Sequence, residues 1–159
     1  MNLTATIDGL GNRTEMRYDV LGKLSSKQDP EGGLERYAYD GYGNLTLLTL
    51  LTDGRYNETS YGYDAFGRLR SETAPGGAVR RFDYDRLGRM TRSSDFLGRA
   101  TLLGYDELGR PVAESRADGM TRSLAYDAVG NLAIADYRGD RRPSLNLTRF
   151  ARRLTAAAY

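Results

Sequence analysis

Six tyrosine–aspartate pairs have the strongest chemical character in this sequence, because each pair places an aromatic ring beside a carboxylate. A glycine follows four residues after each tyrosine, which gives Tyr18, Asp19 and Gly22; Tyr39, Asp40 and Gly43; Tyr63, Asp64 and Gly67; Tyr84, Asp85 and Gly88; Tyr105, Asp106 and Gly109; and Tyr126, Asp127 and Gly130. Basic residues stand directly after several of these glycines. An acid, a base and a ring together suggest sugar hydrolysis, calcium binding, or binding of an anionic or sugar ligand.

The residue types argue against catalysis. Glycoside hydrolysis needs two carboxylates a few ångström apart in different environments, whereas aspartates in repeated turns have identical environments. Asp83 and Asp85 are a close pair at a turn, but no calcium-loop pattern surrounds them. The sequence has no histidine and no cysteine, which removes the commonest general base and the thiolate metal ligands. We therefore predict no catalytic residue, no metal, no cofactor and no enzymatic activity.

The arginines that follow the turn glycines, Arg68, Arg89 and Arg110, are the candidate contacts for a ligand or partner. Columns of Tyr and Arg would suit a glycan; the alternative is that the arginines pair with nearby aspartates or solvent while the tyrosines pack as spacers. Residues 1–137 carry 17 basic and 20 acidic residues, a net charge of −3, so we expect no nucleic-acid partner. Residues 138–159 carry six Arg and one Asp, a net charge of +5.

The elements that position these residues follow from their period. The steps between successive Tyr-Asp pairs are 21, 24, 21, 21 and 21 residues, which indicates a repeat architecture. Polar and apolar residues alternate in Thr14–Tyr18, as in a strand with one buried face. The Asp-x-x-Gly spacing predicts a type I turn followed by a left-handed glycine, which is a hairpin loop with a bulge. Each repeat is therefore predicted to be two short strands and two turns.

The repeat of 24 residues contains the Leu-rich segment 46–54. We expect a wider loop or bulge there to absorb the three extra residues. Strand burial or an interface would explain the leucines, and strand burial is favoured because the repeat phase resumes at Tyr61 and Tyr63.

A meandering sheet advances by about 9.6 Å per two strands, so the tyrosines should form a column in which aliphatic return strands alternate with aromatic ones. A sheet of about a dozen strands must gain a second layer or curl, and its open edges are expected to favour self-association. The sequence supplies a wall and no obvious filling, which favours a hollow assembly or one piece of a larger assembly.

The repeat register ends after Gly139, so we divide the chain into a repeat sheet at 7–139 and a basic tail at 140–159. The spacing of Leu147, Phe150, Ala151 and Leu154 predicts a short amphipathic helix in this tail. The first residues show no charged leader before an apolar run, and no stretch approaches 18 apolar residues, so neither an export signal nor a membrane span is expected.

The motif Tyr63-Asp64-Ala65-Phe66-Gly67-Arg68-Leu69, repeated as residues 84–90, resembles the YD repeat of Rhs proteins, which shell-forming components of bacterial insecticidal toxin complexes and teneurins share. The resemblance covers residues 7–139. Asn44, Asn131 and Lys23 depart from the commonest form, which has Arg. In this family, strips of β-hairpins spiral into a hollow shell that encloses a C-terminal toxin domain, and the resemblance here is to the wall alone.

Together these observations predict an all-β fold of tandem YD-repeat hairpins in a curved, strongly twisted antiparallel sheet. The predicted function is that of a non-enzymatic segment of an Rhs-type β-shell that encloses a toxin; the alternative is a carbohydrate-binding or adhesive surface module. The expected partners are a toxin domain or other shell segments, with glycans under the alternative. The sequence leaves the final location unknown; with no signal peptide, the chain is expected in the bacterial cytoplasm before any specialised secretion.

Overall fold

The computed structural model describes residues 2–138, which form 13 β-strands and no helix. The strand order in space follows the order in the chain from β1 to β13, and the described pairings are antiparallel. The predicted all-β antiparallel fold is confirmed. The predicted helix in the tail at 140–159 lies outside the described residues. Strand β1 (Asn2–Ile7) adds a strand ahead of most of the predicted repeat range.

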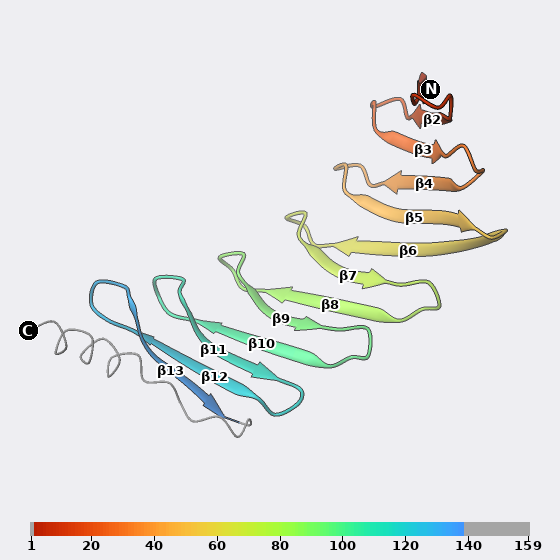
Figure 1. Ribbon diagram of the computed structural model, residues 1–159. Coiled ribbons are helices and arrows are strands. Elements are labelled where there is room, and N and C mark those ends of the chain that lie inside the picture. The colour runs from red at the N-terminus through yellow and green to blue at the C-terminus, as the bar shows by residue number, and fades with distance from the viewer. Residues whose placement is uncertain (1, 139–159) are drawn as a thin grey trace, which may run out of the picture. The chain divides into compact units, whose positions relative to one another are not determined.

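The chain divides into two compact units between Arg80 and Arg81. The first unit is a meander in which each strand pairs with the next (Figure 1). After β1 its strands are β2 (Arg13–Tyr18), β3 (Leu24–Gln28), β4 (Leu34–Tyr39), β5 (Leu45–Thr52), β6 (Arg55–Tyr63) and β7 (Leu69–Thr73).

The second unit repeats the same plan. Strand β8 contains the boundary between the units and pairs with β9. The strands are β8 (Val79–Tyr84), β9 (Met90–Ser94), β10 (Ala100–Tyr105), β11 (Pro111–Arg116), β12 (Thr121–Tyr126) and β13 (Leu132–Arg138).

The Tyr-Asp turns have the geometry that their spacing predicts. In the first, the Gly22 N–H donates to the Asp19 carbonyl at 3.1 Å and the Asp19 N–H donates to the Lys23 carbonyl at 2.8 Å. The same pair of bonds closes all six turns. The turn glycines have φ between 76° and 94°, where a Cβ would be strained.

A second irregularity lies one residue pair beyond each of these turns, and the sequence did not predict it. Tyr18 faces Leu24 while Arg17 faces Ser26, so Ser25 is an extra residue without a partner in the ladder. The register shifts at the equivalent place in all six Tyr-Asp hairpins, between the tyrosine and the residue before it. Such a bulge bends the strand and increases its twist.

The prediction of a wider loop in the 24-residue repeat is wrong. The extra residues lengthen β5 and β6, which are eight and nine residues long, and the loop between them is only Asp53-Gly54. Both loop residues have positive φ, 51° and 71°, as in a tight type I′ hairpin turn. The longer strands form six residue pairs, whereas the β3–β4 hairpin forms three.

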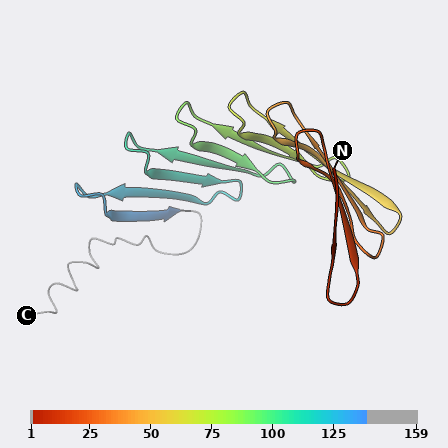
Figure 2. The same cartoon turned by 90° about the horizontal axis from the view of Figure 1, so that it is seen from above.

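Each unit is a single layer of strands in the described part of the chain (Figures 1 and 2). Among the side chains that the structure describes, only Ala135 and Thr49 are buried, at 4% and 8% exposure. Most strand residues are half-buried, including the leucines of β5 up to Leu51. The packing that holds each unit together therefore runs along the sheet, from hairpin to hairpin, and not into a central core.

Candidate functional site

The repeating junction between neighbouring hairpins is the candidate site, because it brings the tyrosine, aspartate, glycine and basic residue of the motif together. Each motif tyrosine pairs directly with the residue that opens the return strand of its own hairpin. The six pairs are Tyr18 with Leu24, Tyr39 with Leu45, Tyr63 with Leu69, Tyr84 with Met90, Tyr105 with Pro111 and Tyr126 with Leu132. The predicted alternation of aromatic and mostly aliphatic strands is present.

The tyrosine hydroxyls connect each hairpin to the one before it. The Tyr105 hydroxyl donates to the Met90 carbonyl at 2.8 Å, and Tyr126 donates to the Pro111 carbonyl at the same distance. In the first unit, Tyr39 donates to Leu24 at 3.0 Å and Tyr63 donates to Leu45 at 2.9 Å. The acceptor is thus the first residue of the preceding return strand.

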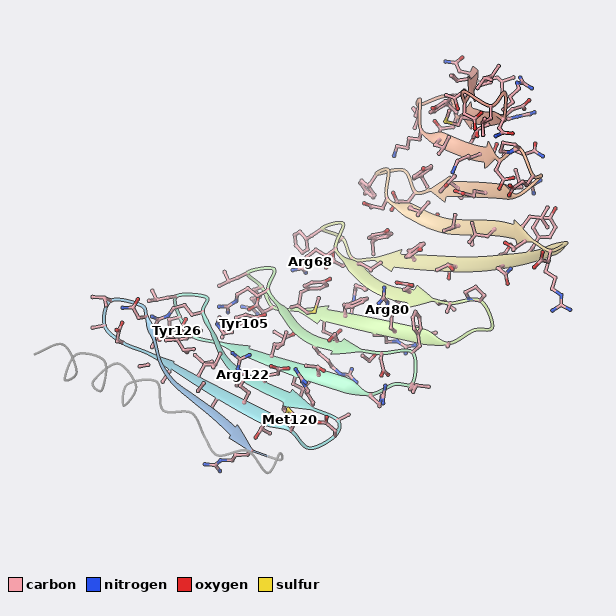
Figure 3. The ribbon with its side chains drawn as sticks, in the orientation of Figure 1. Arg68, Arg80, Tyr105, Met120, Arg122 and Tyr126 are labelled. Carbon is pink, nitrogen blue, oxygen red and sulfur yellow. The ribbon has the colours of Figure 1, made fainter. Side chains whose placement is uncertain are left out.

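The basic residue after the turn glycine lies over the ring of the next motif tyrosine. The Arg110 guanidinium carbon is 4.5 Å from the Tyr126 ring centroid, and that of Arg89 is 4.8 Å from the Tyr105 centroid. In the first unit the Lys23 ammonium is 5.0 Å from the Tyr39 centroid. These distances suit a cation–π interaction. Figure 3 shows Tyr105 and Tyr126 beside the Tyr-Asp turns, with Met120 at the opposite edge.

The motif aspartates cap their own turns. In each of the six, Oδ1 accepts hydrogen bonds from the backbone N–H groups two and four residues later; for Asp85 these come from Leu87 and Arg89, both at 2.9 Å. The same carboxylates therefore satisfy backbone donors that a tight turn leaves without a ladder partner.

The second carboxylate oxygen binds the side chain four residues later. Oδ2 accepts from Nε of Arg68, Arg89 and Arg110 at 2.6 to 2.7 Å, and from the side-chain amides of Asn44 and Asn131 at 2.9 and 3.2 Å. Arg89 also donates to the Asp106 carbonyl at 3.1 Å, so one guanidinium contacts two successive turns. Asn at these positions keeps the bond to aspartate without supplying a cation for the next ring.

These bonds favour the ionised form of Asp40, Asp64, Asp85, Asp106 and Asp127. Burial alone would raise the pKa of Asp106, but hydrogen bonds from the backbone N–H and the guanidinium of Arg110 outweigh it and lower that pKa. The same balance lowers the pKa of Asp64 and of Asp85. The pKa of Asp40 is lowered chiefly by the Asn44 side chain, and the pKa of Asp127 chiefly by the Asn131 backbone N–H. An aspartate held ionised in this way is a hydrogen-bond acceptor and not a general acid.

The structure thus places Arg89 and Arg110 inside the junctions, whereas Arg68 lies over the Phe66 ring of its own turn at 5.2 Å. Each of the three arginines is bound to the aspartate of its own turn. Their side chains are 26% to 31% exposed, so part of each faces solvent. Tyr18 precedes the first junction, and its hydroxyl lies 3.8 Å from the Met16 sulfur. The candidacy of the three arginines for an external ligand stays a prediction.

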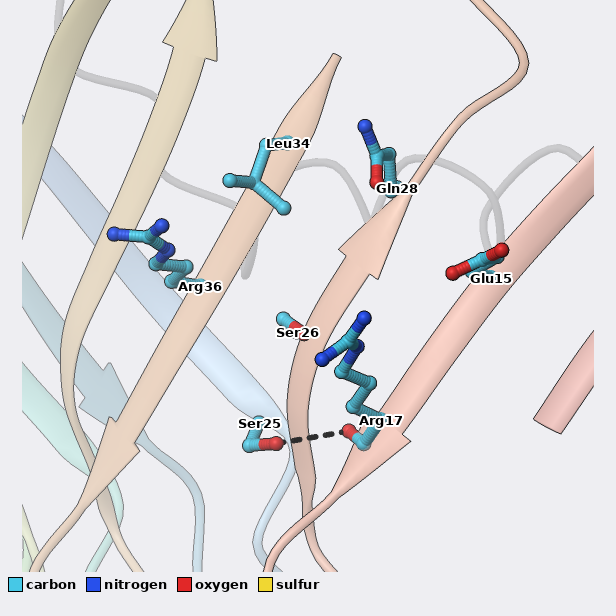
Figure 4. A pocket seen from close by; sticks show the side chains of 7 residues that line it. All are labelled: Glu15, Arg17, Ser25, Ser26, Gln28, Leu34 and Arg36. Atoms are coloured by element: carbon cyan, nitrogen blue, oxygen red, sulfur yellow. Dashed lines mark hydrogen bonds between the residues drawn. The ribbon is translucent and has the colours of Figure 1, made fainter. Parts of the chain in front are cut away.

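A polar groove in the first unit is a feature that the sequence did not indicate. It has a volume of about 450 Å³ and runs over β2, β3 and β4 (Figure 4). Arg17, Ser26 and Arg36 stand in one row across these strands, and Glu15 lines the next row. Arg36 lies over the Tyr56 ring at 5.9 Å, and Glu15 is paired with Arg13. The groove holds opposite charges in an open setting and assembles no catalytic group.

The described residues also contain no candidate metal-binding cluster and no candidate membrane-spanning helix. Within residues 2–138, no three His, Cys, Asp or Glu side chains come together in a way that could hold a metal ion. In the same range, no helix has the length and apolar character needed to cross a bilayer.

The tyrosine-to-carbonyl bonds and the register shift beside each motif tyrosine were not predicted from the sequence. A signal for the first was available: Tyr39, Tyr105 and Tyr126 each follow their acceptor by 15 residues, and Tyr63, in the long repeat, follows its acceptor by 18. No residue type marks the bulge, because the extra position is Ser25 in one hairpin and Thr46, Arg70, Thr91, Val112 or Ala133 in the others.

Comparison with protein-family models finds a match to the RHS repeat over residues 18–56, 39–79, 63–100 and 105–142. No curated protein matches the sequence.

Comparison with solved structures finds the same fold in much larger chains. A crystal structure of TcdB2–TccC3–Cdc42 matches with a TM-score of 0.66, and the Photorhabdus luminescens Tc holotoxin pore with a substituted TccC3 matches with a TM-score of 0.63. Both are 20% identical and cover 78% of this chain. The present chain spans only 7% of the length of either of those chains.

Proposed function

This chain belongs to the RHS repeat family, and from that premise we propose that it is a non-enzymatic segment of a β-sheet wall that encloses a toxin cargo. The wall segment would act sterically, by separating an enclosed polypeptide from proteases and from the cell that produces it. Its partners would be the cargo and neighbouring segments of the same kind. Membership of a repeat family whose units pack only on their neighbours supports a structural role.

The observation that carries the proposal is the junction between hairpins. In the second unit Tyr105 and Tyr126 each bond the preceding return strand while Arg89 and Arg110 cover their rings. Because the junction uses only residues of adjacent repeats, it can be extended by adding repeats without a central core. A sheet that grows in this way is suited to a wall of large area.

The open surfaces of the sheet also support the proposal. In the described part of the chain the sheet is a single layer, so both of its faces are open, and only two described side chains are buried. A binding domain with its own function would be expected to close a core over at least one face. One solved structure with the same fold contains TcdB2, TccC3 and Cdc42, and another is a Tc holotoxin pore with a substituted TccC3, which supports a role in a toxin assembly.

The alternative of a glycan-binding module has less support. The rings of Tyr39, Tyr105 and Tyr126 are already covered on one face by a cation, and their hydroxyls already donate to carbonyls. We therefore advance the wall segment alone.

A chimera tests the proposal. Residues 7–139 would replace a strip of matching length in a TcdB2–TccC3 complex, and protection of the enclosed polypeptide from added protease would be measured. The expected result is that the complex assembles and protects its cargo as the parent does.

The matched control is the same chimera carrying Tyr105→Ala and Tyr126→Ala, which should assemble poorly and expose the cargo. A folded chimera that leaves the cargo as sensitive as free polypeptide would rule out the wall function for this chain.

A further inference from the structure

The tips of the Tyr-Asp turns carry a row of exposed apolar side chains. The residue before the turn glycine is large and apolar in all six turns and is 75% to 95% exposed; the row consists of Leu21, Tyr42 and Phe66 in the first unit and Leu87, Leu108 and Val129 in the second. Phe66 contacts the guanidinium of Arg68 in its own turn, and all six side chains remain largely exposed. Six repeated exposures of this kind indicate a contact surface.

The opposite edge of the sheet differs. Its turns place Glu31, Gly76 and Asp118 at the corresponding positions, and the β5–β6 loop is Asp53-Gly54. Leu10 and Leu97 are exposed there, but they do not form a repeated row. The apolar row therefore belongs to the Tyr-Asp edge, the side of the sheet that the six Tyr-Asp turns form.

The charges at this edge are arranged in a self-complementary way in the second unit. Arg86 stands beside Leu87 at the tip of the β8–β9 turn, and Glu107 stands beside Leu108 at the tip of the β10–β11 turn. Both side chains are exposed, and neither has an ion pair with another residue of the described chain. The two turns are separated by two strands, or about 10 Å.

From this arrangement we propose that the edge formed by the β8–β9 and β10–β11 turns docks against the same edge of a second copy of the chain. A two-fold axis midway between the turns would bring Leu87 of one copy to Leu108 of the other, and Arg86 to Glu107, each contact occurring twice. The remaining turn charges present no obstacle, because Asp85 and Asp106 are paired with Arg89 and Arg110. The partner must carry apolar side chains at the same spacing, and a second copy of the chain does.

This inference rests on the proposed function, since it names one way in which wall segments meet edge to edge. It differs from pairing through the free sides of the terminal strands β1 and β13, which would use backbone groups and would be indifferent to turn charges.

Charge reversal provides the test. Sedimentation of the full chain over a range of micromolar concentrations should show a monomer–dimer equilibrium. Either R86E or E107R alone places like charges at both ion pairs, and the dissociation constant should rise about tenfold or more. The double variant R86E/E107R should recover the original affinity. An equimolar mixture of the R86E chain with the E107R chain should form a heterodimer.

A matched apolar pair provides the control. Leu108→Gln should weaken the dimer, whereas Leu97→Gln, which changes a side chain with the same 78% exposure at the opposite edge, should leave it intact. Circular dichroism and the thermal midpoint would establish that each variant is folded.

A chain that stays monomeric while folded, or a dimer unaffected by R86E and Leu108→Gln, would overturn the inference. Neither result would contradict the proposed wall function, because the chimera experiment measures protection of a cargo and does not depend on this dimer.

Discussion

The Arg110 guanidinium lies 4.5 Å from the centroid of the Tyr126 ring while its Nε donates to Asp106 at 2.6 Å, so one side chain connects a turn to the next hairpin. The arginine therefore contributes to stability through both contacts. A cation–π contact at a partly exposed site contributes about 0.5 to 1 kcal/mol, and an exposed ion pair contributes about the same or less.

We expect a double-mutant cycle on Arg110→Gln and Tyr126→Leu to give a coupling free energy of about 0.5 to 1 kcal/mol, measured by urea unfolding. Arg99→Gln is the control, because Arg99 makes an equivalent bond to Asp95 at 2.7 Å but its side chain is 67% exposed. The Arg99→Gln variant should lose less free energy of unfolding than the Arg110→Gln variant. Strictly additive effects of the Arg110 and Tyr126 changes would contradict the coupling.

The hydroxyl of Tyr105 should contribute separately from its ring. Tyr105→Phe removes the bond to the Met90 carbonyl at 2.8 Å and leaves the ring beneath Arg89. We expect a loss of about 1 kcal/mol in the free energy of unfolding, because the carbonyl loses its donor. Tyr42→Phe, at a residue that is 95% exposed, should produce no measurable change. Equal effects at both positions would show that the hydroxyl bond is not stabilising.

Substitutions at two glycines distinguish destabilisation by backbone strain from destabilisation by steric clash. Gly22 has a φ of 79° and Gly9 has an ordinary φ, while a Cβ at either would meet no atom within 4 Å. Gly22→Ala should therefore destabilise the protein by about 1 kcal/mol or more, and Gly9→Ala should not. Thermal unfolding of the two variants under identical conditions would measure the difference. A loss of the same size in both would mean that the positive φ of Gly22 does not set the cost.

Acid should destabilise the protein over a defined range of pH. The pKa values of Asp40, Asp64, Asp85, Asp106 and Asp127 are all lowered in the folded state. Their contribution is complete above the unfolded pKa, about 3.9, and is lost as the pH falls through the lower folded values. Urea unfolding between neutral pH and below pH 3 should show this decline.

Asp106→Asn removes one of these groups and serves as the comparison for the acid range. The variant should be less stable than the parent at neutral pH but should lose less stability on acidification. A parallel pH dependence in both proteins would show that Asp106 does not take part in the acid effect.

Base should act through Tyr37. Burial, together with the hydrogen bond to Glu35, raises the pKa of Tyr37 to about 12. Because the folded pKa exceeds the unfolded value of about 10, the contribution is complete below pH 10 and is lost between about pH 10 and 12. The Tyr37→Phe protein should show a shallower loss of stability in this range, measured by near-ultraviolet absorbance and circular dichroism together. An unchanged alkaline profile would remove Tyr37 from the explanation.

Much of the architecture is readable from the sequence, because it depends on local chemistry that recurs. Asp and Gly in a fixed tetrad define a turn, and alternation such as that of Thr14–Tyr18 defines a half-buried strand. The order of strands follows, since short turns leave each strand no other neighbour. The loop at Asp53-Gly54 was misread because strand extension there depends on cross-strand packing of leucines, which a local pattern does not express.

The sequence alone determined the period, the turn chemistry, the family and the absence of histidine and cysteine chemistry, because each depends on residue type and spacing within one repeat. Only the tertiary structure decided what the motif side chains contact in the next repeat. The hydrogen bond from Tyr126 to Pro111 and the contact of Arg110 with the Tyr126 ring form because the twist and bulge of two hairpins bring these residues together. The exposure of Leu87 and Leu108 at one edge was likewise decided by which residues the neighbouring strands leave uncovered.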